Sequence, residues 1–372
     1  MALEFLAALA RWGVGAGGLN TKLRTAGGPG GTGGKAERRD DDCTADPDND
    51  PVMDLPKTLP ASWYRSAPLY ALERRAVFLK AWYLLGPVTR FLPDEPVRYE
   101  IAQVRLCASR GAGGLRDVSV VDEDTGLPLR SYITSSGLVF STISGDAPSF
   151  VEFFPDLEPL LARVDFTRLP HRRSIRYEGK FNWKTMVDGY QECLHCQYTH
   201  PSFSVNYPPT FYSVSNHCNF SQHIADPAKP DDGLFLYFFP NCTLNVYGGG
   251  MSSFRVCPTT EPGVTRMEFD YYHVADGAEF ESYFAFVRQV AQEDFELCEK
   301  AQANLEQGVY VEGVLNPDKE TGVAFYQQQV LKLVVAQHEA DKQRAGLMRE
   351  AGPMPVRDGA GRHALCVQKA TA

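Results

Sequence analysis

A short segment near the middle of the chain combines acids and histidines, which are residue types that hold metal ions. Asp188, Glu192 and His195 are spaced at i, i+4 and i+7, so they share one face if the segment is helical. His200 follows His195 by five residues, which is not a same-face spacing, and Pro201 favours a helix end there. Two imidazoles could therefore converge from a helix end and the loop that follows it.

A third ligand is expected from the strong helical pattern over 279–307. Asp294 lies in the middle of the apolar stripe of this helix, where another apolar residue would be expected. A lone buried carboxylate costs several kcal/mol unless it is paired or bound to a metal. Glu293 lies closer to the polar side of the helix, near Gln289 and Lys300. We therefore predict Asp294, rather than Glu293, as the ligand.

Together, His195, His200 and Asp294 would form the facial triad of two neutral histidines and one carboxylate that is typical of non-haem Fe(II) oxygenases. Three protein ligands on one face of the ion leave positions open for O2, water or substrate. The alternative from spacing alone is a structural histidine pair with a salt-bridged aspartate.

Cys193 and Cys196 form a C-x-x-C pair beside His195 and offer a competing interpretation as a zinc site or a redox pair. Against zinc, both cysteines project from the predicted helix in directions different from that of His195. Against a redox pair, such motifs follow a strand and open a helix, whereas the prediction places these cysteines deep in a helix.

The elements that must position these residues are strands followed by long helices, which favours an α+β fold. Apolar residues at helical spacing predict helices, and alternating stretches predict strands. We predict helices over 69–83, 149–164, 183–195, 279–307 and 322–339, strands within 97–143 and over 166–177, and an antiparallel sheet meander over 211–272. Four cysteines are assigned to the core and three histidines to strands: Cys218, Cys242, Cys257 and Cys298, and His217, His223 and His273. Aromatic side chains on these strands could line a pocket suited to a quaternary ammonium: Tyr237, Phe238, Phe239 and Tyr247, with Asn245 beside them.

Composition limits the classes of function. The chain has 372 residues, of which 44% are hydrophobic, so it is long enough for a sizeable core and about two domains. A formal net charge of −9 argues against general nucleic-acid binding. No uninterrupted apolar run reaches the length of about 18 residues that a membrane-spanning helix needs. Nine cysteines are too sparse for a disulfide scaffold, so we expect an intracellular, cytoplasmic protein.

The first 57 residues differ from the rest, since they are rich in Gly and then in charged residues. Such a segment cannot bury enough apolar surface to offset its ordering entropy, which predicts a disordered tail. Arg11, Lys22 and Arg24 with few acids would also suit a mitochondrial transit peptide, although Glu4 and the low serine content weaken that alternative.

The order of three motifs resembles the α-subunit catalytic domain of Rieske oxygenases, and most closely that of fungal choline-monooxygenase-like proteins. The motifs are Asn182–Trp183–Lys184, then Glu192-x-x-His195-x4-His200-Pro201, then Glu293–Asp294 in a late helix. The resemblance implies a helix-grip domain, in which a curved antiparallel sheet is crossed by a long helix. It also implies mononuclear Fe(II) at His195, His200 and Asp294, and a catalytic Glu192 that bridges this iron to the Rieske cluster of a neighbouring subunit.

The resemblance further implies O2 and a small substrate such as choline, electron delivery by a ferredoxin or reductase, and a homo-oligomer, specifically a trimer. The family's [2Fe–2S] cluster requires two Cys and two His ligands, typically as C-x-H and C-x-x-H. No histidine precedes His171, and the only cysteines before it are Cys43 and Cys107. The cluster-bearing insert is missing around the Gly-rich stretch 109–117. Loss of the cluster in evolution and an error in the gene model both stay open.

We therefore divide the chain into a disordered or targeting tail (1–57), a truncated, mostly β remnant of the Rieske-bearing domain (58–165), a mononuclear-iron catalytic domain (166–345) and a loose tail (346–372). The first hypothesis is a choline-monooxygenase-type oxidoreductase whose activity is impaired by the missing cluster ligands. The alternatives are a non-enzymatic helix-grip protein that binds a small ligand, and a metal-dependent hydrolase or isomerase.

Overall fold

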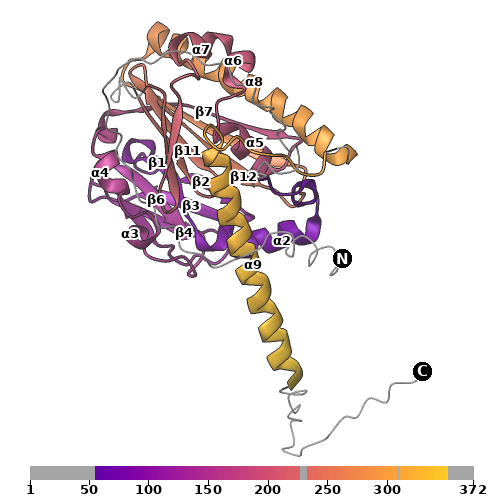
Figure 1. Ribbon diagram of the computed structural model, residues 1–372. Helices are drawn as coiled ribbons and strands as arrows, with labels where there is room; N and C mark the ends of the chain where they lie inside the picture. Colours follow the sequence, from indigo (N-terminus) through magenta and orange to yellow (C-terminus); the bar gives the residue numbers. More distant parts are fainter. Residues whose placement is uncertain (1–54, 227–232, 309, 351–372) are drawn as a thin grey trace, which may run out of the picture. The chain divides into compact units, whose positions relative to one another are not determined.

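The computed structural model describes residues 55–226, 233–308 and 310–350, and all of them belong to one compact unit that begins at Leu55. Most of the two predicted tails lies outside the described residues. The described part is built from antiparallel sheets and helices, which confirms the predicted α+β class (Figure 1). None of the described helices is both long enough and apolar enough to cross a membrane.

The largest sheet has seven strands in the order β7-β13-β12-β11-β10-β9-β8, and every neighbouring pair is antiparallel. Its strands are β7 (His171–Gly179), β8 (Ser213–Asn216), β9 (Phe220–Ile224), β10 (Leu234–Phe238), β11 (Cys242–Tyr247), β12 (Gly250–Pro258) and β13 (Thr265–His273). The predicted meander over 211–272 is therefore correct. Its turn between β11 and β12 uses Gly248 and Gly249 with φ of 58° and 77°, the left-handed conformation that a two-residue hairpin turn requires.

Two smaller sheets come from the region before residue 143. One joins β1 (Trp82–Pro87), β6 (Leu138–Thr142) and β5 (Ser131–Ile133), and the other joins β2 (Val97–Ile101), β3 (Val104–Arg110) and β4 (Val118–Asp122). At the predicted site of the missing insert, Asp117 closes the β3–β4 hairpin. Its carbonyl accepts from the Gly111 N–H at 2.7 Å, and its carboxylate accepts from the Gly113 N–H at 2.8 Å. These sheets and the seven-stranded sheet cluster in one unit, so the domain boundary near residue 165 stays a prediction.

Helices pack around these sheets. They are α2 (Ala67–Ala76), α3 (Phe150–Phe153), α4 (Leu157–Leu161), α5 (Trp183–Tyr190), α6 (Cys196–Thr199), α7 (Pro201–Asn206), α8 (Gly277–Gln307) and α9 (Thr321–Glu350), with short 3-10 turns at Ala61–Tyr64, Phe78–Lys80, Val88–Arg90 and Phe166–Arg168. Helix α8 packs on the seven-stranded sheet, where the ring of Phe295 meets those of Tyr177 and Phe181, and it runs past α5, α6 and α7 in Figure 1. The helix ends at Gly308, whose φ of 72° suits a glycine C-cap.

Four predicted helices are wrong in extent. The last, predicted over 322–339, is α9 and continues to Glu350, into the segment predicted as a loose tail. The segment 69–83 is helical only to Ala76 and enters strand β1 at Trp82, and 149–164 forms two short helices instead of one. Most important for the site, the helix predicted over 183–195 ends at Tyr190. The side chain of Glu192 accepts hydrogen bonds from the Leu194 N–H and the His195 ring, and such local bonds compete with helix continuation.

A buried ion pair connects α2 to α5. The Lys184 ammonium lies 2.7 Å from the Glu73 carboxylate, and both residues are 0% exposed. The indole N–H of Trp183 donates to the same carboxylate at 3.0 Å, and the Lys184 ammonium lies 5.3 Å from the ring centroid of Tyr64. Each polar group of this cluster therefore has a partner, as a buried charge requires.

Candidate metal centre

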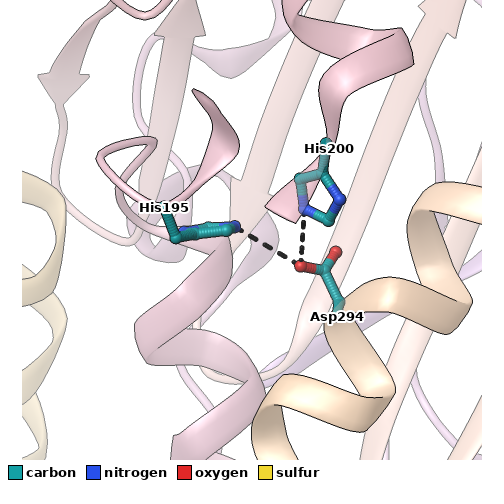
Figure 2. Close-up of side chains that lie close together, drawn as sticks. All are labelled: His195, His200 and Asp294. Carbon is teal, nitrogen blue, oxygen red and sulfur yellow. Dashed lines mark hydrogen bonds and ion pairs between the residues drawn. The ribbon is translucent and has the colours of Figure 1, made fainter. Parts of the chain in front are cut away.

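Three elements bring the predicted ligands together. His195 lies in the turn after α5, His200 lies between α6 and α7, and Asp294 lies near the middle of α8. Their ligand atoms all lie within 4.8 Å of one another. Figure 2 shows both histidine rings directed at one Asp294 oxygen, with Nε2 of His200 at 2.9 Å and Nε2 of His195 at 3.4 Å.

The opposite nitrogen of each imidazole contacts a second carboxylate. Nδ1 of His195 is hydrogen-bonded to Oε1 of Glu192, and Nδ1 of His200 lies 2.8 Å from Oε2 of Glu293. With each Nδ1 donating to its outer carboxylate, each Nε2 faces Asp294, where its lone pair would be available to a metal once no proton is bound there. This arrangement is typical of histidines that bind metals, since the outer carboxylate fixes the ring orientation and the tautomer.

Two details of the sequence interpretation are corrected here. Asp188, Glu192 and His195 do not share a helix face, because only Asp188 belongs to α5. Asp188 instead accepts hydrogen bonds from Tyr64, Tyr326 and Gln327, away from the three ligands. Glu293 does accept from Gln289 on the polar side, as expected, but it also reaches His200. The adjacent acids Glu293 and Asp294 thus contact opposite nitrogens of the His200 ring. Helical periodicity in the sequence could not predict this double contact.

Electrostatics at the triad favour a positive charge. Burial lowers the pKa of His195, but hydrogen bonds and charges from Asp294 and Glu192 outweigh burial and raise this pKa to about 10. For Asp294 the signs are reversed. Burial raises its pKa, but hydrogen bonds and charges from the two histidines outweigh burial and lower this pKa to about 2. Without a metal, a proton on His195 supplies the positive charge that these acids require. Two imidazole nitrogens and a carboxylate with open positions are the donor set that suits Fe(II), so the residues fit a mononuclear iron.

A cavity of about 140 Å³ opens beside the triad. Its walls include all three ligands, both cysteines of the C-x-x-C pair and a group of aromatic side chains: Tyr190, Phe203, Tyr207, Tyr212, Phe235, Tyr247, Phe254 and Phe269. Asn245 and Tyr247 line the cavity as predicted, whereas Tyr237, Phe238 and Phe239 are buried in the core and are not among the lining residues. Among the described residues, the cavity lining contains no lysine or arginine.

His223 presents a neutral ring to this cavity. Burial lowers its pKa to about 3. The Tyr212 hydroxyl donates to Nδ1 at 2.5 Å, and Nε2 donates to the side-chain oxygen of Gln191 at 2.9 Å. Burial therefore keeps this histidine uncharged, and the two hydrogen bonds satisfy its neutral ring. The sequence placed His223 on a strand with a structural role, and the structure agrees, but nothing in the sequence identified Tyr212 and Gln191 as its partners.

Some of the remaining predictions for cysteines and histidines are confirmed, and others are wrong. Cys242, Cys257 and Cys298 are buried as expected, but Cys218 is exposed. His217 lies between β8 and β9 rather than on a strand, and His273 closes β13. A disulfide joins Cys193, in the turn after α5, to Cys196 at the start of α6. The prediction that both cysteines lie deep in a helix, which argued against a redox pair, is therefore wrong: Cys193 precedes α6, and Cys196 is its first residue.

Comparisons with known proteins agree with this geometry. Residues 166–336 match the family described as "Ring hydroxylating alpha subunit (catalytic domain)". The chain is 25% identical over 229 residues to the carnitine monooxygenase oxygenase subunit of Acinetobacter pittii (strain PHEA-2). This match covers 55% of the chain and 60% of the relative's length.

Solved structures show the same fold. The quaternary ammonium Rieske monooxygenase CntA in complex with L-carnitine has a TM-score of 0.65 at 18% identity, with 75% of this chain and 96% of that chain covered. Naphthalene 1,2-dioxygenase from Rhodococcus sp. bound to indole has a TM-score of 0.58 at 15% identity, with 75% and 94% covered. Residues 166–336 therefore belong to the ring-hydroxylating α-subunit catalytic-domain family, and they contain all three residues of the candidate metal centre.

Proposed function

We propose that the protein is a mononuclear non-haem iron oxygenase that hydroxylates a small quaternary ammonium compound with O2. The observation that carries this proposal is the approach of His195, His200 and Asp294 within 4.8 Å, with Nδ1 of each histidine held by an outer carboxylate. Fe(II) bound there would supply the centre at which O2 is reduced. Glu192 and Glu293 hold the two rings so that both Nε2 atoms face Asp294, where they would bind the ion.

The cavity walls support a cationic substrate. Aromatic faces attract quaternary ammonium groups through cation–π contacts. The carboxylates of Glu192 and Asp294 also border the cavity, and its histidine outside the triad, His223, is held neutral by burial. A bound cation thus meets aromatic faces and negative charge, and no described lysine or arginine repels it.

The same walls favour a substrate without a carboxylate. Away from the triad, the described lining residues offer an anion only neutral donors, such as the side chains of Asn245 and Ser252, since they include neither lysine nor arginine. A buried carboxylate without a cationic partner is costly. We therefore propose a choline-like alcohol rather than carnitine as the substrate, although the relatives named above act on or bind carnitine.

The source of electrons differs from that in the relatives. One CntA structure is described as revealing inter-subunit electron transfer, whereas this sequence has no histidine before His171 to complete a Rieske ligand set. We propose an oligomer, by analogy with CntA, in which a ferredoxin, a reductase or a small reductant delivers electrons to the mononuclear site directly. Turnover would then be slow.

The test is anaerobic reconstitution of the purified chain with Fe(II), followed by measurement of iron content, O2 uptake and product with a chemical reductant. We expect about one iron per chain, and hydroxylated product from choline exceeding that from carnitine. Asp294→Ala should lose the iron, while Glu281→Gln, on an exposed part of the same helix, should retain it. Iron binding without O2 uptake or product would contradict the oxygenase and favour a ligand-binding protein. Product from carnitine alone would contradict the choice of substrate.

A further inference from the structure

The C-x-x-C pair encloses a metal ligand. Cys193 and Cys196 form a disulfide, and His195 lies between them in sequence. Both cysteines line the triad cavity, and they are 6% and 5% exposed. The bond therefore lies in the wall of the candidate metal centre, where a small molecule that enters the cavity can reach it.

The same turn also supports the second histidine ligand. The backbone carbonyl of Cys196 accepts from the His200 N–H at 2.9 Å and from the Ser204 hydroxyl at 2.8 Å. Its backbone N–H donates to the Cys193 carbonyl at 3.3 Å, across the turn that the disulfide closes. One end of the disulfide is thus fixed to the segment that carries His200, and its span includes His195.

We propose that Cys193 and Cys196 are a reversible dithiol–disulfide pair whose oxidation organises His195 and His200 for metal binding. This inference rests on the proposed metal site. The reductant is a small thiol: one molecule attacks a sulfur of the pair, the Sγ–Sγ bond breaks, and the released sulfur takes up a proton. A second thiol molecule then displaces the first from the mixed disulfide. Two electrons and two protons enter the protein, and one small-molecule disulfide leaves.

Oxidation should tighten metal binding, because the disulfide restricts the turn to the conformation in which both Nε2 atoms face Asp294. Couplings between two sites in proteins are typically about 5–150-fold in affinity. Linkage is reciprocal, so the metal must stabilise the disulfide by the same factor. If the metal binds the oxidised chain ten times more tightly than the reduced chain, metal binding lowers the reduction potential of the cysteine pair by about 30 mV.

The experiment measures Mn(II) affinity for the oxidised and the thiol-reduced chain after anaerobic removal of the reductant. Mn(II) is the probe because it prefers carboxylate and water ligands to thiolates, so the new thiols do not bind it themselves. Free Mn(II) is counted from its paramagnetic resonance signal, and the state of the pair from alkylation and mass spectrometry of the peptide that carries both cysteines. Cys193→Ser/Cys196→Ser removes the pair, and Cys218→Ser removes an exposed thiol elsewhere.

We expect the oxidised wild type and Cys218→Ser to bind Mn(II) at least about fivefold more tightly than their reduced forms. The double variant should match the reduced wild type whatever the redox buffer. Equal affinity of oxidised and reduced wild type, with the change in thiol count verified, would overturn the inference and leave the metal site intact. Absence of Mn(II) binding in both states would instead overturn the proposed metal site. The reduced wild type gives the comparison even where the double variant fails to fold.

Discussion

Metal binding by this protein should be steeply pH-dependent, because the metal must displace a proton from His195. The neighbouring carboxylates hold the pKa of this histidine at about 10 in the metal-free protein. At pH 7 the ring is then protonated. Because this pH lies about three units below the pKa, removing the proton costs about 4 kcal/mol of the binding free energy. Each rise of one pH unit below 10 lowers this cost, so affinity should increase about tenfold per unit, or about 100-fold from pH 7 to pH 9.

Glu192→Gln tests the origin of this effect. The substitution removes one of the two carboxylates that raise the pKa of His195 but keeps a side-chain oxygen as an acceptor for Nδ1. The pKa should fall toward the ordinary value of about 6.5, and the affinity should then depend less on pH between 7 and 9. As a control, Glu281→Gln removes a carboxylate of helix α8 that pairs with Arg173, and it should leave the pH dependence unchanged.

Isothermal titration of Mn(II) into metal-free protein, in buffers of different ionisation enthalpy, measures both the affinity and the protons released. We expect about one proton released per ion at pH 8 for wild type and Glu281→Gln, and clearly less for Glu192→Gln. An affinity that stays constant from pH 7 to pH 9 in the wild type, with no proton release, would refute the reasoning. It would mean that Asp294 and Glu192 do not share a proton with His195 in solution.

Three further outcomes follow from the same contacts. Lys184→Met should lower the free energy of unfolding, measured in urea, by about 3–5 kcal/mol, because it leaves the Glu73 carboxylate buried without its cation. Adding Glu73→Gln should restore part of the loss, and strictly additive losses from the two substitutions would contradict the pairing. Glu293→Gln should weaken metal affinity about 10–100-fold by loosening Nδ1 of His200, and unchanged affinity would show that this carboxylate does not orient the ring. Since the pKa of His195 is raised, its stabilising effect on the metal-free protein is full below about pH 6.5 and is lost as pH rises through about 10. Metal-free wild type should therefore lose up to about 3 kcal/mol between pH 6.5 and pH 9, and His195→Ala with the same pH profile as wild type would contradict this.

The sequence predicted the triad because its members differ from their surroundings. Asp294 interrupts an apolar stripe, and two histidines stand on either side of an expected helix end. The structure places these three residues together, but it does so through a turn rather than through the helix that the spacing suggested. The sequence therefore predicted the proximity of the three residues better than it predicted the local conformation that brings them together.

The contacts around the triad could not be predicted from periodicity. The helix end at Tyr190 depends on hydrogen bonds that the Glu192 carboxylate makes to the turn, and these exist only once the turn has formed. The pairing of Glu293 with His200 joins residues 93 positions apart, and the neutral state of His223 depends on Tyr212 and Gln191, which belong to two other segments. Such contacts follow from tertiary packing, which no local pattern encodes.

The buried pair of Lys184 and Glu73 limits how far this protein can be divided into modules. The segment that matches the family, 166–336, contains the lysine, whereas its carboxylate partner lies on α2, outside that segment. A catalytic segment expressed alone would enclose an unpaired ammonium and an indole N–H without an acceptor. Helix α2 thus completes the interior of the segment that carries the metal centre, so that segment should need the chain before residue 166 in order to fold.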